Sequence, residues 1–456
     1  MTTKKAVSSD LNRRRFLART GLSLAGWQLV SSGVLAASPN ERLNIAGIGV
    51  GSRGGADVNS MASEGQNIVA LCDVDSKYAG KMFDKYPKAR RFTDYRKMLD
   101  AMDKEIDAVV IGTPDHTHAV IAMEAMRRGK HVYCEKPLAH SVHEVRTLMQ
   151  MARESKVVTQ LGNQGHSFGD IRRLCEWVWD GAIGEVREVW AGCDAFRNVY
   201  CQIPNLPKLK ERHPVPPNLD YDLWIGPVPY IPYSPLWVHW NWRGWMPFGT
   251  GCIGDWFCHV LDPAFWALDL DAPVSVRAEV TGYDPAKHAM CYPPATRITF
   301  EFPAKGKRGP VKVVWHDGAN RIPRPEGLEA DEKLPGTGGV LIGDKGMIIH
   351  GSHGAGGCRI APEKRQDEYL AGGRPEQKIP RVKNHAWDFI QAIKEGRQAG
   401  SHFGYGGPLT QAALLGAIAI RFPGETLRWD DAKATFTNHG PANAYLHVPY
   451  REGWRL

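Results

Sequence analysis

Short apolar runs alternate with helical periods over the first third of the chain. The apolar runs lie at 43–48, 68–71, 107–111, 131–134 and 157–161. Helical spacing of apolar residues covers 119–128 and 142–154. Strands that alternate with helices in this way predict a parallel sheet with helices on both faces. We therefore expect an α/β domain over residues 40–162.

The pattern changes after Gly162. A helical period at 169–180 is followed by strand-like runs at 186–191, 274–280, 296–302 and 311–315, and helices are expected at 385–395 and 409–421. The long connections between the strands are rich in Pro, Gly and Trp, and the stretch 317–336 reads as a surface loop. Strands without regular crossover helices predict a mainly antiparallel, open sheet. We expect a second α/β domain over residues 163–456 that binds substrate and, through its open sheet, supports a homo-oligomer.

A glycine-rich turn joins the first predicted strand to the first helix. Its sequence is Gly49-Val50-Gly51-Ser52-Arg53-Gly54. The next apolar run ends on Asp73, nineteen residues past Gly54. A G-x-G-x-x-G turn in this context lets backbone N–H groups approach a pyrophosphate at a helix N-terminus. A carboxylate such as Asp73 accepts hydrogen bonds from a ribose diol and repels a 2′-phosphate. The sequence therefore predicts a Rossmann domain that binds NAD, with NADP less favoured; the alternative is a glycine-rich turn without a ligand.

Two further segments carry side chains suited to proton transfer. The run Tyr133-Cys134-Glu135-Lys136-Pro137 ends a predicted strand near the expected position of the nicotinamide ring. Asp255 and His259 are four residues apart, so a helix would place them on one face. A histidine oriented by a carboxylate is a candidate general base for a hydroxyl proton, and Lys136 could stabilise the alkoxide. The alternative is an ordinary Asp–His pair on a helix surface.

Together these motifs resemble the Gfo/Idh/MocA family of oxidoreductases. The matching segments are Gly49–Gly54, Thr113-Pro114 with His118, Glu135-Lys136-Pro137, the D-x-x-x-H of Asp255 and His259, and Gly339–Gly346, which resembles a turn of the second domain. The resemblance runs from Arg42 to the end and implies a hydride-transfer site between the two domains. It implies that Lys136, Asp255 and His259 are catalytic. The implied cofactor contacts are Gly49, Gly51, Ser52, Arg53, Gly54, Asp73, Thr113, Pro114, His118, Glu135 and Lys136.

The expected substrate region departs from the family pattern. Thr250 interrupts a glycine run before Asp255, and Phe257 stands where many relatives have glycine, so no relative's substrate transfers to this chain. Residues 161–166 replace an arginine-bearing segment. Their polar members could bind substrate hydroxyls or cap the next helix: Asn163, Gln164 and His166.

An aromatic concentration precedes the catalytic helix. Trp242 and Trp256 are candidate walls of a carbohydrate pocket, because flat rings offer apolar faces to sugar C–H groups. The alternative for each ring is core packing. Arg243 could contact a substrate carboxylate or hydroxyl, or form a structural ion pair. We expect no metal site, because the remaining histidines lack ligand spacing, and His350 and His353 read as part of a glycine-rich loop.

The formal charge of +8 is concentrated at the N-terminus. Residues 1–36 carry six Lys or Arg against one Asp, a net of +5, and no basic run or nucleic-acid motif follows. This distribution disfavours a nucleic-acid partner. Arg13-Arg14-Arg15-Phe16-Leu17 matches the twin-arginine pattern, and the weakly apolar segment after it is too short for a membrane span. We expect residues 1–37 to be a twin-arginine signal that exports the folded protein to the periplasm; the alternative is an accidental basic helix.

Two functions use the same residues. The first is an NAD-dependent oxidoreductase that acts on a sugar, polyol or glycoside and keeps its cofactor tightly bound and internally recycled. The second is a redox-neutral glycoside hydrolase that oxidises the sugar, eliminates the aglycone, adds water and reduces the ring again. A cofactor-stabilised binding protein is disfavoured, because Lys136, Asp255 and His259 are all present.

Overall fold

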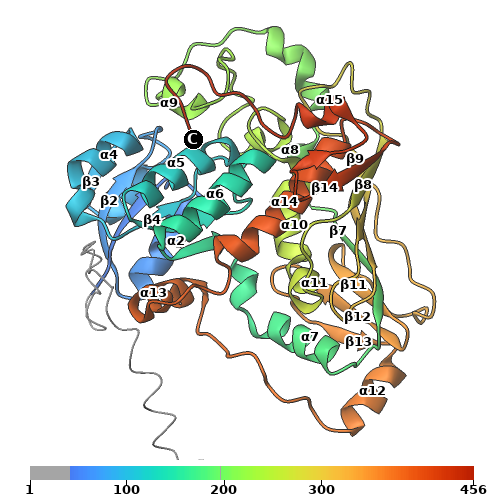
Figure 1. Cartoon of the computed structure of the whole chain (residues 1–456). Coiled ribbons are helices and arrows are strands. Elements are labelled where there is room, and N and C mark those ends of the chain that lie inside the picture. Colours follow the sequence, from blue (N-terminus) through green and yellow to red (C-terminus); the bar gives the residue numbers. More distant parts are fainter. Residues whose placement is uncertain (1–41, 196) are drawn as a thin grey trace, which may run out of the picture. The chain divides into compact units, whose positions relative to one another are not determined.

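Six parallel strands form the first sheet of the computed structural model, which describes residues 42–456 except Phe196 (Figure 1). The strand order is β3-β2-β1-β4-β5-β6. The strands are β1 (Asn44–Ile48), β2 (Asn67–Cys72), β3 (Arg90–Phe92), β4 (Ala108–Ile111), β5 (His131–Glu135) and β6 (Thr159–Gly162). The order reverses between β1 and β4, and ligands bind at such a switch point, beyond the carboxyl ends of the strands. The predicted Rossmann sheet is confirmed.

Helices connect these strands, as the alternating pattern predicts. They are α2 (Arg53–Ser63), α3 (Gly80–Lys85), α4 (Tyr95–Met102), α5 (Asp115–Arg127) and α6 (Val142–Ser155). Two details differ from expectation. The short strand β3 was not predicted, because its polar sequence Arg-Arg-Phe carries no apolar run. Helix α5 begins at Asp115, four residues earlier than expected, and so includes His116 and His118 in its first turns.

The second sheet has nine strands in the order β13-β12-β11-β7-β10-β9-β8-β14-β15. Its strands are β7 (Val186–Cys193), β8 (Ser275–Thr281), β9 (Ala295–Phe302), β10 (Val311–Gly318), β11 (Thr337–Gly343), β12 (Gly346–Gly351), β13 (Arg359–Ala361), β14 (Thr426–Asp430) and β15 (Thr435–Phe436). Neighbouring strands are antiparallel except β7 and β10. The mainly antiparallel sheet is confirmed, and the expected turn within Gly339–Gly346 is the hairpin between β11 and β12.

Further helices follow the first sheet along the chain. They are α7 (Gly169–Trp179), α8 (Arg197–Tyr200), α9 (Tyr221–Ile225), α10 (Gly251–Val260), α11 (Asp262–Ala267), α12 (Glu363–Ala371), α13 (His385–Glu395), α14 (Phe403–Ala419) and α15 (Gly440–Asn443). Helices α10 and α14 contact each other and the second sheet, and α14 also contacts α6, so they lie between the sheets (Figure 1). Helix α10 carries the predicted Asp255 and His259, and the packing brings it against the first domain.

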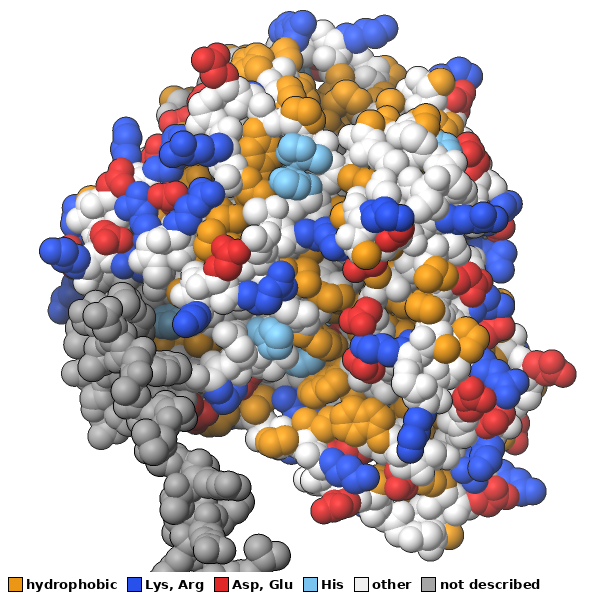
Figure 2. All heavy atoms as spheres, viewed as in Figure 1, with side chains coloured by type: hydrophobic (Ala, Val, Ile, Leu, Met, Phe, Trp, Pro, Cys, Tyr) orange, Lys and Arg blue, Asp and Glu red, His pale blue; other side chains and the backbone are white. Residues whose placement is uncertain are grey.

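The opposite face of the second sheet carries charged side chains along β8 and β9, where Arg297 and Glu279 form an ion pair of 3.1 Å. A homo-oligomer built on this sheet stays a prediction. On the face drawn in Figure 2, basic and acidic side chains are interspersed. None of the helices described is both long and apolar enough to cross a membrane. Eight of the nine cysteines are buried.

Candidate active site

The glycine-rich turn forms one end of a cavity of about 510 Å³. Gly49 has φ +75°, and a Cβ there would lie 2.6 Å from Thr113 Cγ2, so only glycine fits the turn. A Cβ at Gly54 would lie 2.1 Å from the carbonyl oxygen of Gly49. Glycine at this position therefore lets the start of α2 pack closely against the strand ends. Ser52, the N-cap of α2, makes no side-chain capping bond. The first amides of α2 are thus left for an anion such as a pyrophosphate.

Asp73 follows β2 and lines the same cavity. Its carboxylate accepts hydrogen bonds from the backbone N–H groups of Val50 at 2.8 Å and Gly51 at 3.0 Å, and from Asp75 at 2.9 Å. Burial raises the pKa of Asp73 to about 6, although these hydrogen bonds oppose the shift. The geometry fits the predicted role, because a carboxylate beside the turn can accept hydrogen bonds from a ribose diol.

Two segments from the second part of the chain line the end of the cavity beside Asp73, where the adenosine would lie (the adenosine end). The covering segment (residues 218–243) docks on the loop after β2, with Asp220 N donating to Val74 O at 2.8 Å. His239 in this segment stacks on Tyr78 with ring centroids 3.9 Å apart, and its Nε2 lies 3.3 Å from the Asp75 carboxylate. Trp454, near the C-terminus, also lines the cavity.

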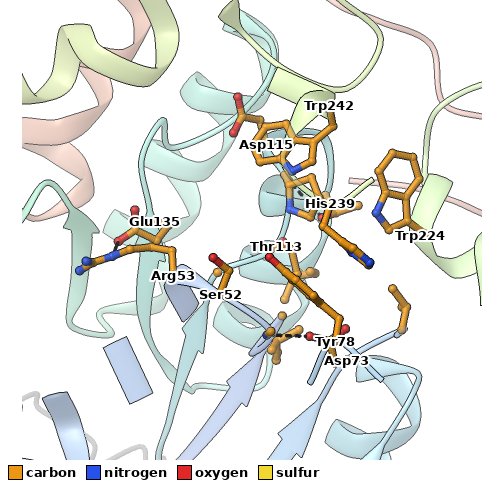
Figure 3. Close-up of a pocket in the computed structure, with 18 of the residues that line it drawn as sticks. Ser52, Arg53, Asp73, Tyr78, Thr113, Asp115, Glu135, Trp224, His239 and Trp242 are labelled. Atoms are coloured by element: carbon orange, nitrogen blue, oxygen red, sulfur yellow. Dashed lines mark hydrogen bonds and ion pairs between the residues drawn. The ribbon is translucent and has the colours of Figure 1, made fainter. Parts of the chain in front are cut away.

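Figure 3 shows the arrangement along the cavity: Asp73 and Tyr78 lie at one end, Arg53 and Glu135 at the other, and Thr113 between them. Trp224, His239 and Trp242 face these residues from the second part of the chain.

Lys136, the residue after β5, forms an ion pair with Asp255 on α10. Its ammonium also donates to the backbone oxygen of Asp255 at 2.9 Å. The Tyr200 hydroxyl donates to the same carboxylate, and Arg243 Nε lies 3.2 Å from it. Burial alone would raise the pKa of Asp255, but Lys136 and Arg243 outweigh it and hold the pKa below its ordinary value. Asp255 is therefore a fixed anion that orients Lys136.

His259 lies one helical turn beyond Asp255 and lines the cavity. Its Nδ1 is buried without a hydrogen-bond partner among the described residues. Burial, followed by the charge of Lys136, lowers the pKa of His259 well below its ordinary value. The imidazole is therefore neutral at physiological pH and can accept a proton. Lys136, Asp255 and His259 come together, as the motifs predict; their catalytic role stays a prediction.

The Glu135 carboxylate links the turn to the segment after β6. It accepts hydrogen bonds from Arg53 Nε at 3.2 Å and Gln164 Nε2 at 2.6 Å, and Arg53 also pairs with Asp57 at 2.5 Å. Arg53, Glu135 and Gln164 line the cavity. His118 does not: its ring nitrogens lie 2.8 Å from the oxygen of Pro137 and 2.9 Å from that of Thr113. It therefore supports the two loops from behind the cavity.

The predicted substrate residues divide into two groups. Trp242, Arg243 and Trp256 line the cavity with Gln164. Arg243 lies between two indoles, with its guanidinium carbon 4.0 Å from the centroid of Trp240 and 4.2 Å from that of Trp242. It also pairs with Asp255, so the structural ion pair is the alternative that forms.

Asn163 and His166 are placed away from the cavity lining. Both are buried and bind the carboxylate of Asp262, at 3.0 Å each. Tyr405 donates to the same carboxylate at 2.5 Å. This network ties β6 to α11 and α14, so these two polar side chains are occupied in holding the domains together.

Three functional candidates were not among the predicted site residues, although Asp115 follows a strand at the carboxyl edge of the first sheet. Asp115 lines the cavity and accepts hydrogen bonds from Thr250 N at 3.1 Å and Oγ1 at 2.7 Å. Burial, followed by the charge of Asp255, raises the pKa of Asp115 to about 7. His239 and His353 reach the cavity from loops distant in sequence, where no local pattern marks them.

Comparisons with known proteins agree with this architecture. Residues 43–163 match a family model described as an oxidoreductase family with an NAD-binding Rossmann fold. Residues 196–308 match the C-terminal alpha/beta domain of an oxidoreductase family. The predicted cofactor, NAD, is confirmed for the domain that carries the glycine-rich turn.

Individual relatives are distant. Levoglucosan dehydrogenase of Pseudarthrobacter phenanthrenivorans is 29% identical over 39% of this chain and 37% of its own length. A glycosyl hydrolase family 109 protein of Shewanella pealeana is 31% identical over 39% of this chain and 44% of its own. The matches thus span about two fifths of these relatives. An inositol dehydrogenase homologue of Azotobacter vinelandii, solved with NADH and myo-inositol, shares the fold, with a TM-score of 0.57 and 14% identity over 86% of this chain and all of that one.

Proposed function

The chain belongs to the Gfo/Idh/MocA family of oxidoreductases, and we propose that it transfers a hydride between NAD and a sugar, polyol or glycoside. One observation carries the proposal: the glycine-rich turn, Asp73, Lys136, Asp255 and His259 all line one continuous cavity. A cofactor bound along the turn and a substrate beside α10 would therefore meet in the same space.

The residues divide the chemistry between them. NAD, when bound, accepts the hydride from the carbon that carries the substrate hydroxyl and can return it. Neutral His259 takes the hydroxyl proton, and the Lys136 ammonium stabilises the oxygen as negative charge develops on it. Asp255 fixes the position of Lys136 through their ion pair. The indole faces of Trp242 and Trp256 suit the apolar C–H surface of a sugar ring.

We propose further that the cofactor stays bound through each cycle. The covering segment and Trp454 line the adenosine end of the cavity, so they would contact a bound dinucleotide and slow its release. The twin-arginine motif lies outside the described residues, and export to the periplasm by that route is part of this proposal. A retained cofactor suits a protein that works where no NAD pool exists.

The redox-neutral glycoside hydrolase is the second candidate. It is favoured by a second imidazole in the cavity, that of His353, and by the relative named as a glycosyl hydrolase. This cycle also returns the hydride to the substrate, so it needs the same cofactor and the same catalytic residues.

The test is a panel of free sugars, polyols and 4-nitrophenyl glycosides added to the purified protein. An oxidoreductase should change the absorbance of the bound nicotinamide with at least one compound. Release of nitrophenol without net reduction would favour the hydrolase. If no compound changes the nicotinamide absorbance or releases nitrophenol, the catalytic proposal fails in favour of a binding protein.

A further inference from the structure

The loop between β12 and β13 (residues 352–358) brings a second imidazole into the cavity. His353 stacks on His259, with ring centroids 4.1 Å apart and planes inclined by 28°. Both rings line the cavity, and Trp256 meets each of them edge-on. Two imidazoles from separate parts of the chain thus form one wall of the substrate space.

The backbone of this loop is held in an unfavourable conformation. His353, Gly354 and Ala355 have φ values of 50°, 70° and 59°, so three successive residues are left-handed. Non-glycine residues persist in this region only where the surrounding structure imposes it, which occurs frequently at functional sites. The loop packs directly against the segment after β6, because a Cβ on Gly165 would lie 2.2 Å from Gly354 N. This contact holds the loop in its conformation.

One ring nitrogen of His353 is left for a ligand. Its Nδ1 lies 2.9 Å from Ser352 Oγ, and Nε2 makes no hydrogen bond within the described residues. Burial lowers the pKa of His353, and the positive charge of Lys136 lowers it further. His259 is neutral for the same reasons. The cavity therefore holds two neutral bases, whereas removal of a hydroxyl proton requires only one.

We propose that His353 is a second acid–base residue, which removes and returns a proton on the substrate carbon next to the oxidised carbon. The inference rests on the proposed function, because that C–H bond becomes acidic only when its neighbour has become a carbonyl. His259 and Lys136 act on the oxygen of the oxidised carbon, and His353 transfers the proton of the neighbouring carbon. The division explains why the fold presents two stacked imidazoles rather than one.

The step balances without a further reagent. His353 takes the proton, and the C–H electron pair forms the C=C bond of an enolate. When the carbonyl re-forms, the C–O bond to the aglycone breaks on the far side of the deprotonated carbon, and the leaving oxygen takes the proton from His353. Water then adds at the vacated carbon and loses a proton, and a proton returns to the neighbouring carbon. With NAD bound, the carbonyl carbon would regain its hydride and the carbonyl oxygen would regain its proton from His259, so the net reaction is hydrolysis.

The experiment separates the two proton transfers. The protein carrying NAD is incubated in D₂O with sugars and 4-nitrophenyl glycosides, and recovered sugar is examined by NMR for deuterium at the neighbouring carbon. We expect exchange with the unmutated protein and its loss by about 10²–10⁴-fold in H353N. Asparagine tolerates the left-handed backbone. In H353N the first reduction of bound nicotinamide should fall far less than the exchange, and calorimetry with the same sugar measures any accompanying change in affinity.

Two controls exclude a purely structural effect. H213Q removes an imidazole outside the cavity and should exchange normally. In H353G, added imidazole should restore part of the exchange, which a structural role would not allow.

The possible failures are distinguishable. Exchange that survives in H353N, or a nicotinamide step lost as completely as the exchange, overturns the role of His353. Reduction of the nicotinamide without any exchange in the unmutated protein also overturns it and leaves the proposed function standing. Absence of nicotinamide reduction with every sugar overturns the proposed function, and the role of His353 with it.

Discussion

At the scale of single residues, Lys136 and His259 line the same cavity in different electrostatic surroundings. Lys136 compensates the buried Asp255 carboxylate, whereas the Nδ1 of His259 has no partner among the described residues. Removing a lysine from a buried ion pair leaves an uncompensated charge, which costs about 3–5 kcal/mol when no other partner remains. Arg243 and Tyr200 still contact Asp255, so the cost here should be smaller.

Substitution of His259 should therefore affect catalysis and leave stability nearly unchanged. H259Q is expected to lower turnover by about 10²–10⁴-fold, the contribution of a positioned acid–base group. K136M should lower turnover to a similar degree and also lower the melting temperature. Steady-state kinetics and thermal melts of both variants check this. Near-full turnover in H259Q would remove His259 from the mechanism.

The Asp73 carboxylate should select NAD over NADP. D73A removes the acceptor for the ribose diol and the charge that repels a 2′-phosphate, so NAD affinity should fall and NADP affinity should fall less or rise. Fluorescence titration of the nucleotide-free protein with each dinucleotide measures both constants. Equal affinities of the unmutated protein for NAD and NADP would contradict this assignment.

The raised pKa of Asp73 makes NAD binding depend on pH. Without cofactor, the buried carboxyl keeps its proton up to about pH 6, and a ribose diol binds the charged form better. NAD affinity should therefore increase as the pH rises from 5 through 6, then level off above about 7. D73N should lose this dependence, while any contribution from Asp115, whose pKa is about 7, would remain. A flat pH profile in the unmutated protein would show that Asp73 does not bind the diol as an anion.

At the scale of elements, the sequence predicted what local patterns encode. Helix α13 begins and ends at the expected residues, and β1, β2 and β4–β6 lie within two residues of the expected runs. The D-x-x-x-H spacing correctly places Asp255 and His259 on one helix. The contacts that the sequence did not predict join residues far apart in the chain. Asp262 binds Asn163 and His166, and the close contact of Gly165 with Gly354 positions His353 at the cavity. Such contacts depend on tertiary packing, which no local period records.

The C-terminal tail (residues 446–456) is a second element that the sequence left unexplained. Arg451 pairs with Asp222 of the covering segment at 2.6 Å and donates to the oxygen of Gly226 at 2.6 Å. Trp454 then reaches the cavity. The tail therefore fastens the covering segment at the adenosine end.

Shortening this tail should release the cofactor faster. W454A, or removal of residues 451–456, is expected to reduce the NAD that remains after dialysis, with little change in the absorbance step on adding sugar in excess NAD. Nucleotide extracted from dialysed protein and measured by chromatography gives the retained fraction. R455A, altered in the same tail outside the cavity lining, is the matched control. Unchanged retention in W454A and the truncated chain would show that the tail does not hold the cofactor.

At the scale of the whole molecule, the proposed export by the twin-arginine route raises the question of how the cofactor is regenerated. Outside the cytoplasm no soluble NAD pool exists, so a dehydrogenase that released reduced cofactor would stop after one turnover. A cofactor loaded during cytoplasmic folding and carried out by the twin-arginine route avoids this, because that route exports folded proteins. Each cycle must then restore the cofactor, either by reducing a second sugar or by returning the hydride to the same glycoside.

We therefore expect the purified mature protein to carry NAD and to turn over many times without added nucleotide. Both versions of the closed cycle require cofactor release to be slow compared with turnover, and we expect the covering segment and the tail to slow it. The measurement is the turnover number per protein after desalting, with no nucleotide supplied and with a compound active in the sugar panel. W454A should start at the same rate and lose activity as NAD escapes, and added NAD should restore it. A protein that emerges empty and consumes free NAD in stoichiometric amounts would show that its cycle is open.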